Sequence, residues 1–311
     1  MREFVIVADG TCDLSREVRE RFDIRVLPFH VVFPDGESRN LLPDWEGDPT
    51  PEAFYADLKK HPDQYMTSPY NIAEFAREFE EILDAGKDVL CLTISSGLSG
   101  TYGFATRGRE EALAGHPEGK IYCVDTLRYS AAFGMMAVYA SRLRAEGKTL
   151  EQTAAWLEEN KGRFHQMGWL DDLSFVAKKG HLSHSKAFFG TLVGIKPLGD
   201  IDAQGMTTVL GKAKGEKAAY AAILSYIEAT VEHPEEQIFF LAHSNRPRQA
   251  EELRRLVQER FSPKEILQTQ VHIPCGINVG PGLNAVYYMG KPLTENLAEE
   301  RALLTSFLEQ K

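Results

Sequence analysis

The segment of this chain best suited to chemistry is Ser95-Ser96-Gly97-Leu98-Ser99-Gly100-Thr101-Tyr102. It follows an apolar run at 89–94 and precedes a helical pattern, so we predict that it joins a buried strand to a helix. In parallel α/β sheets such joints bind anions, because unpaired N–H groups at the start of the helix face the ligand. Hydroxyl groups add donors, and glycines let a ligand approach the backbone. We therefore expect Ser96, Gly97 and Ser99 to bind an anionic group, unless Ser99 only caps the helix.

Thr67 and Ser68 form a second hydroxyl pair, just before Pro69 and a helix expected to begin near Asn71. A Thr-Ser pair before a proline is usually a turn and a helix cap. By itself, this pair does not indicate a binding site.

Neither a catalytic triad nor a metal site is apparent in the sequence. No histidine and acid are placed beside Ser99, and the Gly-x-Ser-x-Gly elbow of hydrolases is missing. His181 and His184 lie three residues apart without a nearby glutamate, so we expect no metal there. We also expect no cofactor. The alternative that stays open is an enzyme acting on an acyl or phosphorylated small molecule with Ser99 or His181.

The first half of the chain alternates predicted strands with predicted helices. Strands are predicted at 4–8, 24–33 (interrupted by Pro28), 89–94 and 121–124, and helices at 14–22 (with Asp13 as N-cap), 101–114, 130–144 and 150–160. The strands are nearly all apolar, which indicates an α/β domain with a mainly parallel sheet covered on both faces.

The second half differs in composition and in the order of its predicted elements, and it is predicted to form an α+β domain. Residues 180–215 are rich in glycine and are predicted to form strands and turns. Beyond them we predict helices at 216–231, 247–261 and 294–310, strands at 237–242, 265–272 and 285–289, and a Gly-rich segment at 276–282. The change near Gly162 predicts two domains, 1–162 and 163–311, with 294–310 as a terminal helix of the second.

Composition excludes several classes of protein. The chain has 311 residues, a net charge of −10 at pH 7 and 43% hydrophobic residues, so it is globular and too acidic for nucleic acid. No apolar stretch approaches the roughly 18 residues of a membrane span, and the start reads as a strand rather than a signal peptide. The 4 cysteines form no CxxC pair, so we expect a cytoplasmic protein without disulfides.

The order of several motifs resembles the DegV family of bacterial fatty-acid-binding proteins over nearly the whole chain. The serine-rich segment 95–102 is the most specific of them. The others are Asp9-Gly10-Thr11-Cys12-Asp13-Leu14, Thr67-Ser68-Pro69, Asp125-Thr126, Asp171-Asp172-Leu173, Lys179-Gly180, Lys196-Pro197 and Gly280-Pro281-Gly282. The resemblance implies two domains with one long-chain fatty acid in a tunnel between them. It also implies a carrier rather than an enzyme, whose bound acid a separate fatty acid kinase converts to an acyl phosphate.

The resemblance further implies which residues bind the head group. Thr67 and Ser99 match the hydroxyls that hold the carboxylate, with Ser68, Ser96 and Gly97 lining the same corner.

Several positions depart from the family's pattern, among them Lys214, where the family often has arginine. Two departures bear on the head group. His181 stands where the family commonly has arginine, and Asn278 where it commonly has histidine. A neutral histidine or an asparagine supplies less charge than arginine, and asparagine cannot take up a proton. We therefore expect His181 and Asn278 to lie at the ligand, with lipid binding kept and kinase coupling altered or lost.

Overall fold

The computed structural model describes residues 2–45, 49–182 and 194–309. Contacts divide the chain into two compact units: Met1–Asp44 with Asp63–Lys161 (unit 1), and Trp45–Pro62 with Gly162–Lys311 (unit 2). The division into domains 1–162 and 163–311 stays a prediction. The contacts add that residues 45–62 pack with unit 2.

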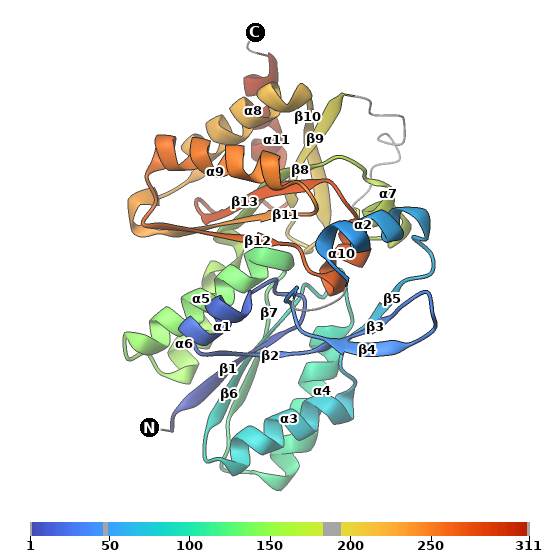
Figure 1. The fold of residues 1–311 in the computed structure, drawn as a ribbon. Helices are drawn as coiled ribbons and strands as arrows, with labels where there is room; N and C mark the ends of the chain where they lie inside the picture. Colours follow the sequence, from blue (N-terminus) through green and yellow to red (C-terminus); the bar gives the residue numbers. More distant parts are fainter. Residues whose placement is uncertain (1, 46–48, 183–193, 310–311) are drawn as a thin grey trace. The chain divides into compact units, whose positions relative to one another are not determined.

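Unit 1 is built on a parallel sheet in the order β2-β1-β6-β7. Its strands are β1 (Phe4–Asp9), β2 (Ile24–Leu27), β6 (Asp88–Thr93) and β7 (Ile121–Asp125). Every residue of β6 is buried, as a strand covered on both faces requires. Figure 1 shows α3 and α4 on one face of the sheet and α1, α5 and α6 on the other. The helices are α1 (Arg16–Arg21), α3 (Ile72–Asp84), α4 (Thr101–Gly115), α5 (Ser130–Ala145) and α6 (Leu150–Asn160). The predicted parallel α/β arrangement is confirmed.

A small antiparallel sheet, in the order β4-β3-β5, also belongs to unit 1. Its strands are β3 (Phe29–Val32), β4 (Ser38–Leu41) and β5 (Met66–Ser68). The single strand predicted at 24–33 is therefore wrong. Pro28 has no N–H to donate to a ladder, and the chain leaves the parallel sheet there and enters this second sheet.

The cap predicted for the first helix is also wrong. Ser15, not Asp13, is the N-cap of α1, and its hydroxyl accepts a hydrogen bond from the Val18 N–H at 3.4 Å. Asp13 adopts a left-handed backbone with φ of 49°. Its carboxylate instead accepts a hydrogen bond from the Ser130 hydroxyl at 2.5 Å, so it serves a tertiary contact.

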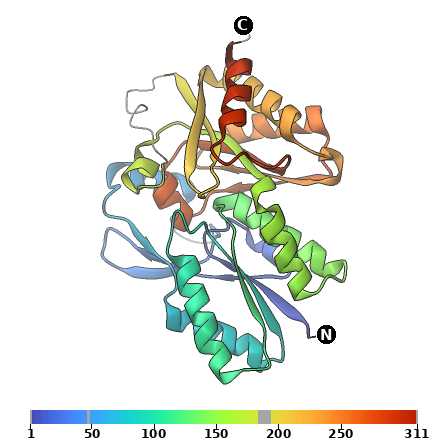
Figure 2. The same cartoon turned by 180° about the vertical axis from the view of Figure 1, so that it is seen from behind.

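Unit 2 contains a mixed sheet in the order β10-β9-β8-β13-β11-β12. Its strands are β8 (Phe164–Leu170), β9 (Ile195–Ile201), β10 (Thr207–Lys214), β11 (Ile238–His243), β12 (Glu265–Gln270) and β13 (Leu283–Met289). Its helices are α2 (Pro51–Lys60), α7 (Ser174–Lys178), α8 (Gly215–Thr230), α9 (Pro247–Phe261), α10 (Ile273–Val279) and α11 (Ala298–Glu309), with short 3-10 turns η1 (Lys161–Arg163), which begins in unit 1, and η3 (Pro234–Glu236). α8 and α9 supply much of its apolar core. Figure 2 shows α11, in dark red, beside β10, which it contacts.

The Gly-rich segment predicted at 276–282 is helical in its first part, because α10 extends to Val279. Gly276 allows α10 to approach α2 closely, since a Cβ there would lie 2.7 Å from the Tyr55 hydroxyl oxygen. The Tyr55 hydroxyl also donates to the Val271 carbonyl at 2.8 Å. α2, from the first half of the sequence, is thus fixed to elements near its end.

Candidate functional site

The serine-rich segment lies between β6 and α4, as predicted, and residues 95–100 of it are called here the hydroxyl loop. Its backbone is bonded to the turn that follows β7. The Ser95 N–H donates to the Arg128 carbonyl at 2.9 Å, and the Ser96 N–H donates to the Asp125 carboxylate at 3.1 Å. The Thr126 hydroxyl donates to the Thr93 carbonyl at 2.7 Å, just before the loop. The carboxyl ends of β6 and β7 therefore fix the backbone conformation of the hydroxyl loop.

Ser99 lies one residue before the N-cap of α4. Gly100 is that N-cap and gives no side-chain hydrogen bond to the helix. The Ser99 hydroxyl accepts from the Thr101 N–H at 3.3 Å and lies 2.8 Å from the Thr101 hydroxyl. The Ser99 hydroxyl thus bonds to the first residue of α4, but Gly100 rather than Ser99 is the N-cap, so the interpretation of Ser99 as the cap is wrong. Further N–H groups of that turn lack acceptors within the helix and are suited to an anion.

Asp9 fixes the start of the hydroxyl loop from the neighbouring strand β1. Its buried carboxylate accepts from the Ile94 N–H at 2.7 Å and from the N–H and hydroxyl of Thr11 at 2.9 and 2.5 Å. Burial raises the pKa of this carboxyl, although these hydrogen bonds oppose the shift. The Asp9-Gly10-Thr11 motif therefore has a structural role that its sequence did not reveal.

Thr67 and Ser68 lie on β5, in the small antiparallel sheet of unit 1. Thr67 is opposite Val31 of β3 and half-buried, while Ser68 is opposite His30 and exposed. The expected turn is thus a short strand, and the helix after it, α3, has Asn71 as its N-cap. Thr67 and Ser99 belong to the same unit, on different elements.

His181 and Asn278 lie in unit 2, at the ends of two helices that pack together, α7 and α10. The His181 N–H donates to the Val176 carbonyl at 2.8 Å, and the Asn278 amide donates to the Pro274 carbonyl at 3.1 Å. Gly280 makes the packing possible, because a Cβ there would lie 2.3 Å from the Phe175 ring. His184 lies outside the described residues.

Asp171 of the Asp171-Asp172-Leu173 motif forms an ion-pair network within unit 2. Its carboxylate accepts from Lys196 Nζ at 2.5 Å and from Arg246 Nε at 2.7 Å. Lys196 belongs to another family-like motif, Lys196-Pro197. The two motifs therefore join the end of β8 to β9 and to the start of α9.

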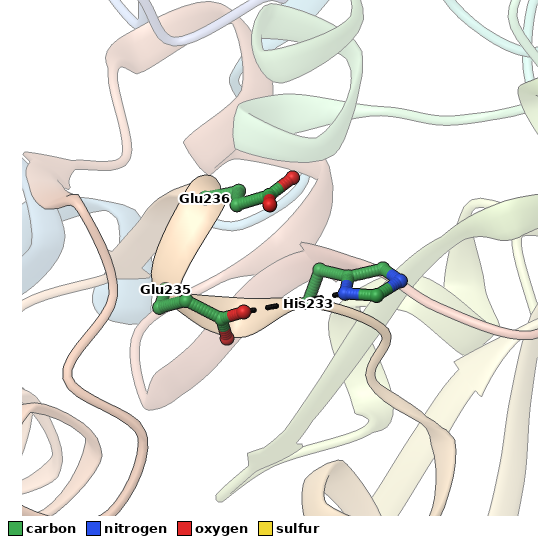
Figure 3. Close-up of side chains that lie close together, drawn as sticks. All are labelled: His233, Glu235 and Glu236. Atoms are coloured by element: carbon green, nitrogen blue, oxygen red, sulfur yellow. Dashed lines mark ion pairs between the residues drawn. The ribbon is translucent and has the colours of Figure 1, made fainter.

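One group of possible metal ligands occurs among the described residues. His233, Glu235 and Glu236 have ligand atoms within 4.8 Å of one another, and all three are exposed. Figure 3 shows the Glu235 carboxylate facing the His233 ring, with Nδ1 and an oxygen 4.0 Å apart. Exposed carboxylates commonly occur without a metal ion. We assign no site here, and the expectation of no metal stays a prediction.

The hydropathy of the helices shows whether any of them could span a membrane. Within the described part of the chain, no helix has both the length and the apolar character needed to cross a bilayer.

Comparison with known proteins gives a consistent result. A family model described as "Uncharacterised protein, DegV family" matches residues 3–291. A DegV domain-containing protein of Clostridium perfringens is 31% identical over 290 residues, which cover 93% of this chain and 98% of the relative.

Solved structures show the same fold. One, described as fatty acid binding of a DegV family protein from Thermus thermophilus, is 29% identical with a TM-score of 0.81, covering 93% of this chain and 100% of the other. DegV of Bacillus subtilis, described as a fatty acid binding protein, is 25% identical with a TM-score of 0.78, covering 94% and 100%. This chain therefore belongs to the DegV family.

Proposed function

We propose that this chain binds a long-chain fatty acid and that the hydroxyl loop holds its carboxylate. The observation that carries the proposal is the position of this loop at the carboxyl end of β6 and the first turn of α4. An anionic head group there meets hydroxyl donors and the positive end of a helix of 15 residues. The descriptions of the Thermus thermophilus and Bacillus subtilis relatives support the same ligand class.

The remaining contacts stay predictions. We expect Thr67 and Ser99 to donate to the carboxylate, with Ser68, Ser96 and Gly97 beside them. His181 and Asn278 are expected at the ligand from unit 2. A tunnel for the acyl chain is likewise implied only by the family resemblance.

Energetics favour a ligand with a long apolar tail. Burying about 15 methylenes at roughly 0.8 kcal/mol each gives an upper bound near 12 kcal/mol. One hydrogen bond to a charged group is worth about 1.5–3 kcal/mol. The tail therefore supplies most of the affinity, and the head group sets the orientation and selectivity.

Native mass spectrometry of the purified protein tests the proposal. We expect a bound C14–C18 acid, and after delipidation a thermal shift with added acids of that length. Ser99→Ala is expected to weaken binding about tenfold or more, because it removes a donor to a charged group. Ser306→Ala is the matched control, since Ser306 is exposed on α11 and its hydroxyl donates to the Leu303 carbonyl of its own helix. Absence of a bound acid together with an unmoved melting temperature would contradict the proposal.

We also propose that the bound acid can be presented to a separate ATP-dependent kinase, and that the kinase phosphorylates it slowly on this chain. Asn278 cannot exchange a proton, and a neutral His181 lacks the charge of arginine. Formation of acyl phosphate with a fatty acid kinase and labelled ATP measures the coupling. We expect a low rate that Asn278→His raises while the affinity for the acid stays within twofold. An equal rate in both proteins would contradict the role given to position 278.

An enzyme with Ser99 as nucleophile has less support. The hydrogen bonds of the Ser99 hydroxyl, within the described residues, are to Thr101 rather than to a histidine or a carboxylate. A serine without a neighbouring base is a weak nucleophile. Turnover of an acyl ester that is lost in Ser99→Ala would favour this alternative.

A further inference from the structure

The terminal helix α11 is an element that the family does not account for. The family model ends at residue 291, whereas α11 spans Ala298–Glu309. α11 packs on β10 and α8 of unit 2, and Figure 2 shows it beside β10. Its role must therefore be derived from the surface that it covers.

The strand that α11 covers lies at the end of a sheet. β10 comes last in the order of the described strands of unit 2, and its ladder partner is β9. At the start of β10, Thr207 forms a bridge with Leu182. Further along, the Val209 carbonyl accepts from Arg301 of α11 at 2.8 Å. The pairing with β9 is irregular between Val209 and Gly211, so α11 bonds to this edge strand where the strand bulges.

The apolar side of α11 fits against β10 where a glycine leaves room for it. A Cβ at Gly211 would lie 2.7 Å from Leu308 and 3.1 Å from Leu304, both on α11. Leu304 is fully buried and belongs to the same core cluster as Ile223 and Ile227 of α8. Without α11, this part of the core of unit 2 would face water, which is unfavourable.

The beginning of α11 is fixed as firmly as its last turn. Leu297, one residue before the helix, is fully buried in the same core cluster. Glu300 is only 6% exposed, and its carboxylate accepts from the N–H of Thr294 at 2.8 Å and from the Thr294 hydroxyl. A glutamate is rarely buried unless its oxygens are bonded in this way. α11 is therefore an integral cover of β10 rather than a loosely attached tail.

We infer that α11 closes a surface of unit 2 that would otherwise pair with a second copy of this chain. An edge strand offers backbone groups to any strand that reaches it, and covering the edge with a helix is one way in which proteins prevent this. An exposed apolar face beside the edge adds to the tendency to associate. The partner is a second copy, because two identical edges complement each other about a twofold axis through their backbone groups.

The charges of β10 sharpen this inference. Lys212 and Lys214 are exposed on the strand, and two copies that meet along β10 would bring four lysines together. Pairing of two copies should therefore become tighter as salt screens the repulsion, whereas binding of an acidic partner would become weaker. The inference does not rest on the proposed function.

The test detaches α11 in the full-length protein with the double variant Leu304→Asp and Leu308→Asp. Size-exclusion chromatography with light scattering measures the mass in solution over a range of protein concentrations. We expect the mass to double relative to the unmodified protein, and more completely at about 1 M than at about 0.1 M salt. The matched control is Ala302→Asp with Thr305→Asp, at exposed residues of the same helix, and it should keep the mass of the unmodified protein.

A second measurement covers the case in which the double variant does not fold. Arg301→Gln keeps the apolar contacts of α11 and removes its bond to the Val209 carbonyl. Hydrogen exchange followed by mass spectrometry should be several-fold faster in β10 of this variant and unchanged in β12, at the other end of the sheet. A folded double variant that keeps the mass of the unmodified protein overturns the inference. Unchanged exchange in β10 of Arg301→Gln also overturns it, because α11 would then not protect the edge.

Discussion

Aspartates of family-like motifs have opposite roles in the two units. In unit 1, Asp9 and Asp125 accept hydrogen bonds from backbone N–H groups and so shape the hydroxyl loop. In unit 2, Asp171 accepts from Lys196 and Arg246, and its charge is neutralised by its neighbours. The first arrangement positions the loop that we propose to bind the head group, whereas the second joins strands and helices. The same residue type in one family pattern therefore either shapes a loop or joins elements, and its partners decide which.

If the Asp171 ion pairs and the neighbouring packing of α7 on α10 in unit 2 are architectural, Gly280→Ala should have the largest effect on stability. The new Cβ would overlap the Phe175 ring, and Gly280 has a φ of +74° that alanine adopts only with strain. We expect the free energy of unfolding to fall by about 4 kcal/mol, as overpacking and left-handed strain add. Chemical denaturation measures this.

Gly180→Ala separates the two causes. Gly180 has the same φ of +74°, but no atom of the described residues lies within 4 Å of its added Cβ. A loss of about 1–2 kcal/mol is expected from the backbone alone. Equal losses in the two variants would show that the contact with α7 contributes nothing.

Low pH should destabilise unit 2 through His243, at the end of β11. Burial lowers the pKa of His243 to about 4, and its Nδ1 accepts from the Arg246 N–H at 3.2 Å. The unfolded chain takes up this proton near the ordinary histidine pKa of 6.5, so the contribution of His243 is complete above pH 6.5 and is lost as the pH falls toward 4. A shift of this size corresponds to about 3 kcal/mol.

The measurement is the free energy of unfolding from pH 7 to pH 4 in the unmodified protein and in His243→Gln. The variant should lose less stability over this range. His61→Gln, at an exposed histidine, should follow the unmodified protein. Parallel curves for His243→Gln and the unmodified protein would contradict the prediction.

The smallest expected effect is that of Asp125→Asn in unit 1. Asparagine keeps an oxygen that can accept from Ser96 and Leu127, so stability should change by less than about 1 kcal/mol. Removing a negative charge beside the hydroxyl loop should tighten binding of a fatty acid a few-fold. Displacement titration measures the affinity, with Asp84→Asn, an exposed carboxylate at the end of α3, as control. Weaker binding would mean that the carboxylate itself takes part in recognition.

The parallel sheet and the position of the hydroxyl loop could be predicted because local pattern determines both. Buried strands read as apolar runs, and ligand loops follow their carboxyl ends. The split at Pro28, the use of Ser15 as cap and the helical α10 depend on partners distant in sequence. The burial of Arg128 could not be predicted for a related reason. Arginines are usually exposed, and only the tertiary structure shows that this one is 2% exposed.

The packing of α2 on α10 has a consequence for how the chain is made. The Tyr55 hydroxyl and the Val271 carbonyl that it bonds are 216 residues apart. During synthesis α2 is complete long before α10 leaves the ribosome. Until then the apolar residues Phe54 and Tyr55 of α2 lack the contacts that bury them in the folded protein. Such distant pairings slow folding, because a long loop must close before the contact forms. Unit 2 can therefore be completed only after nearly the whole chain has been translated.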